Sequence, residues 1–178
     1  MAVGLGLGLG FVAVLAVAGG AAKPSLPAGG DGPPYPPLPP ERRHISSRFG
    51  WRTDPVRGGD QNHPGIDLPA PVGTPVFAPV DGVVARIDRD GVGRGVTNGN
   101  AVFIGSPAMR WCFLHLSRVD VQSDQVVRRG QVIGAVGSTG KSTGPHLHFQ
   151  VYRFGELVDP ELLFTPDMWA NPRPRALV

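Results

Sequence analysis

The feature that most constrains the fold of this chain is its content of glycine and proline. The 178 residues include 26 Gly and 20 Pro, about a quarter of the chain. Both residues interrupt helices and favour turns, so a bundle of long helices is excluded. No stretch between Gly50 and Pro160 repeats apolar residues at the 3.6-residue helical period over three turns.

Six apolar segments rich in Val carry the pattern of strands. Gly, Pro or other turn residues separate them every eight to fifteen residues. The expected strands lie within 73–80, 82–87, 100–104, 110–116, 131–136 and 146–152. We therefore predict an all-β domain, with one short helical turn near residues 161–164.

Four parts are expected along the chain. Residues 1–22 contain no charged side chain and predict either an export signal that is cleaved or a membrane anchor that is retained. Residues 23–43 include eight prolines and predict an extended linker, acting as a spacer or as an inert disordered segment. Residues 44–165 are expected to form the folded domain, and 166–178 an irregular tail.

Charge and cysteine content exclude several classes of function. The formal net charge is +3 and no run of Lys or Arg occurs, so nucleic acid is not an expected partner. Cys112 is the single cysteine, which excludes a disulfide within the chain and predicts a small core residue. The Gly-Lys-Ser-Thr string at 140–143 lacks the spacing and the following helix of a phosphate-binding loop.

Four of the five histidines occur in patterns that metal chemistry can use. His146 and His148 are separated by one residue, so a strand would place both imidazoles on one face. His63 and Asp67 are four residues apart around a Pro-Gly pair, which excludes a helix and predicts a turn entering a strand. Two His and one carboxylate form a ligand set of the zinc type. Each pattern alone is weak, but together, with His115 on an intervening strand, they indicate a metal site.

These residues resemble the lysostaphin/LytM-type zinc endopeptidases of bacterial cell walls. The resemblance covers about residues 43–160, and its marks are 45–52 with Pro55, His63-Pro-Gly-Ile-Asp67, 73–84, His115-Leu-Ser117 and 130–149. It implies a compact antiparallel sheet or half-barrel with a central cleft and long loops. It also implies one Zn²⁺ ion held by His63, Asp67 and His148, with His115 and His146 as catalytic residues in the same cleft.

The function implied by the resemblance is hydrolysis of the peptide cross-links of bacterial peptidoglycan. Water activated by the metal would attack, assisted by the two histidines, because bound zinc lowers the pKa of water from about 15.7 to near 7. The expected partner is the peptidoglycan stem peptide, and the expected location is the periplasm or cell envelope. Residues 1–22 would provide any membrane contact, and we expect a monomer. Which histidine is the general base, and which cross-link is cut, stay open.

Two positions depart from the family pattern, at Phe113 and Asp124. The family usually has Tyr where Phe113 stands, and Gly in the turn that holds Asp124. Strand alternation places His115 on one face with Trp111 and Phe113, and Cys112 on the other face.

Two alternative functions are considered beside the enzyme. Some members of the family lack zinc ligands and activate other wall hydrolases, so a catalytically silent wall-binding module or activator is one alternative. A carrier module of the biotinyl/lipoyl type is another, since 77–84 and 129–134 also resemble one. Lys141 does not sit between two hydrophobic residues, as a carrier lysine would. All three expected ligands and both cleft histidines are present, which favours an active enzyme.

Overall fold

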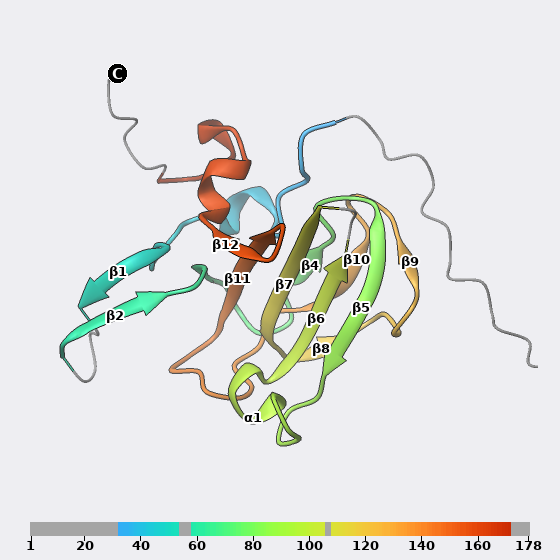
Figure 1. The fold of residues 1–178 in the computed structure, drawn as a ribbon, viewed down its shortest axis with the longest axis horizontal. Helices are drawn as coiled ribbons and strands as arrows, with labels where there is room; N and C mark the ends of the chain where they lie inside the picture. Colours follow the sequence, from blue (N-terminus) through green and yellow to red (C-terminus); the bar gives the residue numbers. More distant parts are fainter. Residues whose placement is uncertain (1–31, 54–57, 106–107, 172–178) are drawn as a thin grey trace, which may run out of the picture.

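The Val-rich segments of the sequence form strands in antiparallel sheets, so the prediction of an all-β fold is confirmed (Figure 1). The computed structural model describes residues 32–53, 58–105 and 108–171. The largest sheet has seven strands in the order β12-β11-β7-β6-β5-β9, with β3 paired to β11. Its strands are β3 (Ile66–Pro69), β5 (Gly82–Asp88), β6 (Asn100–Gly105), β7 (Met109–Leu116), β9 (Val126–Val127), β11 (His146–Arg153) and β12 (Glu156–Val158).

A three-stranded sheet and a hairpin complete the framework. The three-stranded sheet has the order β4-β10-β8, and β1 pairs with β2 in the hairpin. Their strands are β4 (Pro75–Phe77), β8 (Arg118–Val119), β10 (Val132–Ala135), β1 (Gly50–Thr53) and β2 (Asp60–His63). Four short helical elements lie among the described residues: η1 (Pro40–Arg42), α1 (Gly95–Asn98), η2 (Pro160–Leu163) and η3 (Pro166–Met168). The helical turn expected near 161–164 is η2.

The six predicted strands correspond to β4, β5, β6, β7, β10 and β11. The strands that the sequence did not reveal are two to four residues long. β2 consists of Asp-Gln-Asn-His, which has no apolar alternation, and it forms through its pairing with β1. Such strands depend on their partners more than on their own residues.

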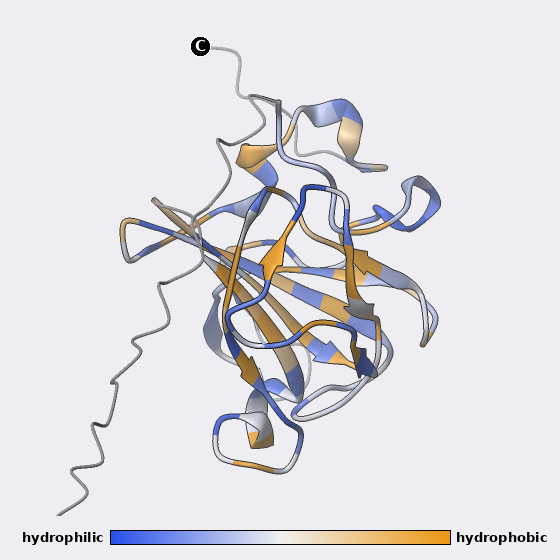
Figure 2. Cartoon of the chain, turned by 90° about the vertical axis from the view of Figure 1, so that its right-hand side faces the viewer, coloured by the Kyte–Doolittle hydropathy of each residue, from blue (hydrophilic) through white to orange (hydrophobic). Residues whose placement is uncertain are grey.

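Alternation along the long strands separates two faces of the large sheet, and Figure 2 shows the alternating hydropathy. On one face Phe113 of β7 and Phe149 of β11 are fully buried, with ring centroids 5.3 Å apart. Val76 of β4 and Ile133 of β10 belong to the same cluster, so the main core lies between the two sheets. The opposite face carries a smaller cluster of Ala101, Phe103, Cys112 and Leu114.

The packed domain extends beyond both ends that the sequence predicts. Within the expected linker, Leu38 is fully buried, and the carbonyl oxygen of Pro37 accepts a hydrogen bond from the Phe77 amide at 3.0 Å. Proline lacks an amide hydrogen but keeps its carbonyl, so a proline-rich segment can still dock on a strand. Within the expected tail, Trp169 is 4% exposed and packs on Phe164. The residues 35–43 and 166–171 are therefore part of the domain rather than a free linker and an irregular tail.

The predicted export signal or anchor at 1–22 lies outside the described residues. In the ranges that the structure describes, no helix has the length and apolar character needed to cross a membrane.

The buried position of Leu38 gives a test of the N-terminal boundary. We expect Leu38→Ala to lower the free energy of unfolding by about 2–4 kcal/mol, because it leaves a cavity in the main core. Leu162→Ala is the matched control, since Leu162 is 74% exposed and its truncation should change stability by less than about 0.5 kcal/mol. Chemical denaturation of both variants measures the difference. Equal stability of the two would contradict the packing of residues 35–43.

Candidate metal centre

His63 and Asp67 are brought together by a turn between two strands. β2 ends at His63 and β3 begins at Ile66, with Pro64 and Gly65 between them. A Cβ on Gly65 would collide with the Phe149 carbonyl oxygen, so glycine allows the turn to lie against β11. The turn thereby delivers both side chains to the edge of β11.

The register between β3 and β11 places the third member of the group. Asp67 lies directly opposite His148, and the two strands run antiparallel. Leu147 and Phe149, the neighbours of His148, are fully buried in the main core. Because strand side chains alternate, His148 points to the opposite face, together with Asp67.

The ligand atoms of His63, Asp67 and His148 all lie within 4.8 Å of one another. His148 Nδ1 is 2.8 Å from Asp67 Oδ1, and His63 Nε2 is 3.2 Å from the same oxygen. The two ring nitrogens are 3.2 Å apart. Three side chains from separate segments thus present donor atoms to one point.

The outer nitrogens of both imidazoles are already engaged. His63 Nδ1 donates to the carbonyl oxygen of Arg48 at 2.9 Å, and His148 Nε2 donates to Gln150 Oε1 at 3.1 Å. With the outer nitrogens engaged, the inner nitrogens are the ones left to bind an ion beside the Asp67 carboxylate. Metal-binding histidines are usually held in this way, and two imidazoles with one carboxylate suit zinc. The residues therefore fit a metal ion.

Arg48 is itself held in place. Its guanidinium pairs with the buried Glu161 and donates to the carbonyl oxygen of Asn171 at 2.5 Å. The C-terminal segment thus positions the backbone carbonyl that holds His63.

His115 enters the group through an irregularity in β7. Between the pairs Val102–Phe113 and Asn100–Leu116, β6 advances two residues and β7 advances three, which is a bulge. His115 has a φ of 64°, a left-handed conformation that is rare for a residue other than glycine. Leu116 joins the main core as a result, and the His115 ring lies 4.9 Å from that of His146.

This bulge corrects the prediction made from strand alternation. Regular alternation would place His115 beside Trp111 and Phe113, and both of those residues lie in the main core. The extra residue turns His115 to the face of His148, whose ring centroid is 6.0 Å away. Phe113 is fully buried in the core, so the missing family hydroxyl at this position would not face the metal centre.

Both additional histidines have one nitrogen fixed by a backbone carbonyl. His115 Nδ1 donates to the Thr139 carbonyl oxygen and His146 Nδ1 to that of Gly144, each at 2.8 Å. His146 Nε2 is 3.7 Å from Asp67 Oδ1. Each ring therefore has Nε2 as its remaining nitrogen, next to the three candidate ligands.

Burial and hydrogen bonding set the charges in the group. Burial lowers the pKa of His115 to about 4, although the Thr139 carbonyl partly opposes this, so His115 is neutral at neutral pH. Burial alone would raise the pKa of Asp67, but the adjacent His148 and His63 outweigh it and hold that pKa far below its usual range. The centre therefore combines a neutral base with a fixed carboxylate.

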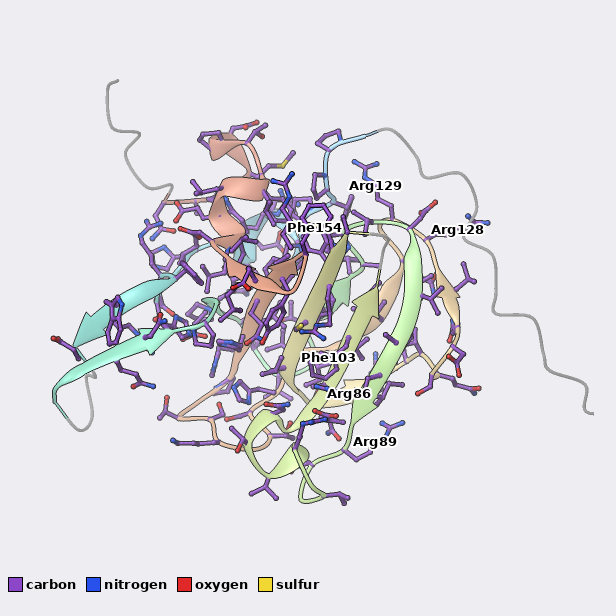
Figure 3. The ribbon with its side chains drawn as sticks, in the orientation of Figure 1. Arg86, Arg89, Phe103, Arg128, Arg129 and Phe154 are labelled. Atoms are coloured by element: carbon purple, nitrogen blue, oxygen red, sulfur yellow. The ribbon has the colours of Figure 1, made fainter. Side chains whose placement is uncertain are left out.

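The face of the large sheet that carries the centre extends along β7 to the smaller apolar cluster. Cys112 lies on it, fully buried, and burial raises the pKa of its thiol to about 12, in line with the predicted inert core residue. Arg86 stacks over the Phe103 ring, 3.6 Å from its centroid, and Figure 3 shows the two side chains together.

The structure brings all five predicted site residues into one group: His63, Asp67, His115, His146 and His148. Sequence reasoning missed Gln150 and the carbonyl groups that orient the rings. Gln150 could have been found, because it follows His148 by two residues and so shares its face. The carbonyl acceptors carry no sequence signal.

Comparisons with known proteins identify a family and several proteins to which this chain is similar. The sequence model of peptidase family M23 matches residues 61–160 of this chain. A DD-carboxypeptidase/endopeptidase named Mpg, from Neisseria meningitidis, is 44% identical over 123 residues, which are 68% of this chain and 27% of that protein. The peptidoglycan DD-endopeptidase ShyC of Vibrio cholerae is 40% identical over 126 residues, or 70% of this chain and 28% of that protein. The chain thus spans about a quarter of the length of these curated relatives.

Solved structures show the same similarity. A zinc-containing peptidase from Vibrio cholerae superposes with a TM-score of 0.65 at 32% identity, over 80% of this chain and 41% of that one. The catalytic domain of lysostaphin, an antimicrobial peptidase from Staphylococcus simulans, gives a TM-score of 0.56 at 32% identity. That match covers 69% of this chain and 93% of the lysostaphin domain.

The low pKa of His115 predicts a stability difference that depends on pH. Its ordinary pKa of 6.5 in the unfolded chain lies above the native value of about 4. On acidification the unfolded chain therefore binds the proton first, and the stability present above pH 6.5 is lost as the pH falls towards 4. We expect metal-free protein to lose about 2 kcal/mol more than His115→Asn between pH 7 and pH 5, measured by chemical denaturation.

Asn is chosen because it tolerates the left-handed backbone of position 115. Parallel loss of stability in the two proteins would show that His115 is not held neutral by the fold.

Proposed function

We propose that this chain is a zinc-dependent endopeptidase acting on bacterial peptidoglycan. The chain belongs to peptidase family M23, whose sequence model matches residues 61–160. This family match confirms the resemblance seen in the sequence. It also confirms, at the level of the family, the expectation that the chain is an enzyme. The observation that carries the proposal is the convergence of His63, Asp67 and His148 within 4.8 Å.

The proposed substrate is the peptide cross-link between stem peptides. Relatives from Neisseria and Vibrio are named as DD-carboxypeptidase/endopeptidase and peptidoglycan DD-endopeptidase. The family match over residues 61–160 includes all five histidine and aspartate residues of the centre. Peptidoglycan lies outside the cytoplasmic membrane, so this function requires export to the periplasm or cell envelope. Residues 1–22 are proposed to direct that export, as a cleaved signal or a retained anchor.

The proposed roles follow from the directions of the side chains. His63, Asp67 and His148 would hold the ion; zinc, when bound, supplies a Lewis acid that makes water acidic and polarises the scissile carbonyl. His115, neutral at neutral pH, keeps its Nε2 lone pair free to accept a proton from the attacking water. His146 Nε2 lies 3.7 Å from Asp67 Oδ1, where it can stabilise the developing oxyanion or protonate the leaving amine. The two imidazoles can exchange these roles.

Removal of one proposed ligand tests the metal dependence. We expect His148→Ala to lose both bound zinc and the release of new amino termini from purified sacculi, because one of three protein ligands is gone. Zinc content by elemental analysis and muropeptides by mass spectrometry measure the two effects. Phe103→Leu on the same sheet face serves as a control that keeps the centre. Sacculi cut at the wild-type rate by metal-stripped His148→Ala would refute the proposal.

Removal of a proposed catalytic histidine should separate binding from chemistry. His146→Ala leaves the three proposed ligands in place, so zinc content should stay near that of the wild type. Turnover should fall by about 10²–10⁴, the usual contribution of a general acid or base. A variant that binds zinc and keeps full turnover would remove His146 from the mechanism. Zinc binding by the wild type without any cleavage would favour the alternative of a silent wall-binding module or activator.

A further inference from the structure

A line of hydrogen bonds leads away from the candidate metal centre along β11. His148 Nε2 lies 3.1 Å from Gln150 Oε1, and Gln150 Nε2 lies 3.1 Å from the Tyr152 hydroxyl. The three residues alternate along one strand, so they share the face that carries the centre. Gln150 is 9% exposed, and its polar atoms are largely shielded from water.

The orientation of the Gln150 amide selects the tautomer of His148. Oxygen can only accept, so Oε1 requires the proton of the ring to sit on Nε2. Nδ1, which faces Asp67 at 2.8 Å and His63 Nε2 at 3.2 Å, then carries a lone pair. A reversed amide would instead donate to Nε2 and move the ring proton to Nδ1, where it would block a metal ion.

The surroundings of Gln150 hold its side chain in one place. Cys112 lies opposite it on β7 and is fully buried. Gly65 closes the other side, since a Cβ at that position would lie 2.9 Å from Gln150 Cβ. The amide of Gln150 therefore has defined partners at both ends, the His148 ring at the oxygen and the Tyr152 hydroxyl at the nitrogen.

His63 and His148 are held by different kinds of acceptor. His63 uses the backbone carbonyl of Arg48, which a substitution cannot remove, whereas His148 uses a side chain. We propose that Gln150 is a positioning residue of the metal centre, which accepts the Nε2 proton of His148 and so directs the Nδ1 lone pair at the ion. This inference rests on the proposed function, because it takes His148 as a ligand.

Two substitutions at position 150 test the proposal. Gln150→Met has a similar length but no acceptor, and we expect zinc affinity to fall by about 10–100-fold, the usual effect of losing such a partner. Gln150→Glu keeps an acceptor for the Nε2 proton and should bind zinc at least as tightly as the wild type. Gln122→Met, at an exposed position, is the matched control and should not change affinity. Competition of the full-length chain with a chromogenic chelator for zinc measures all four proteins.

A spectroscopic measurement separates positioning from a merely structural role. In zinc-loaded protein labelled with ¹⁵N-histidine, the wild type should show a His148 Nε2 proton that exchanges slowly with solvent, and Gln150→Met should show faster exchange of that proton. Gln150→Val, which also lacks the acceptor and suits a strand, serves if Gln150→Met does not fold.

The possible failures are distinguishable. A wild-type chain that binds no zinc contradicts the proposed function itself. A wild type that binds zinc and cleaves sacculi, beside a folded Gln150→Met with the same zinc affinity and the same exchange of the His148 Nε2 proton, overturns the inference about Gln150 alone.

Discussion

The candidate centre depends on the register between β3 and β11. Asp67 faces His148 only because Ile66 pairs with Phe149 and Leu68 with Leu147, and all four of these apolar side chains are fully buried. A shift by one residue would turn Asp67 towards the core and the apolar residues towards the face that carries the centre. Hydrophobic burial on one face of the sheet thus fixes the polar geometry on the other.

A second consequence of the same core is a strained residue beside the proposed ligands. His115 adopts a positive φ, and an isolated strand would not retain a conformation of this kind at a histidine. The burial of Leu116 and Phe113 on either side of the bulge stabilises it. The strained backbone changes the position of the His115 side chain, because the bulge brings this neutral imidazole out of the core and next to His146 and His148. Stability and the proposed chemistry are therefore divided between the two faces of one sheet.

The sequence allowed the strands and the composition of the centre to be predicted, but not its supporting structure. Residue spacing singled out His146 and His148 on one face, the His63 and Asp67 pair and the isolated His115. The family resemblance added their division into metal ligands and catalytic residues. The direction of His115 was predicted wrongly, because a bulge is set by backbone geometry that strand alternation does not contain. The docking of Leu38 was missed because a proline-rich composition describes the preference of a segment and not the surface it meets. The backbone carbonyls that orient the histidine rings could not be predicted either, because their contacts depend on which surfaces meet in the fold.

The central claim is that three side chains from separate strands share one zinc ion. Crystals of the chain grown with zinc, measured on both sides of the zinc absorption edge, test it directly. The account predicts a single strong anomalous peak about 2.0–2.2 Å from His63 Nε2, Asp67 Oδ1 and His148 Nδ1. An anomalous map with no peak between these three atoms, or with His148 bound through Nε2, would contradict it.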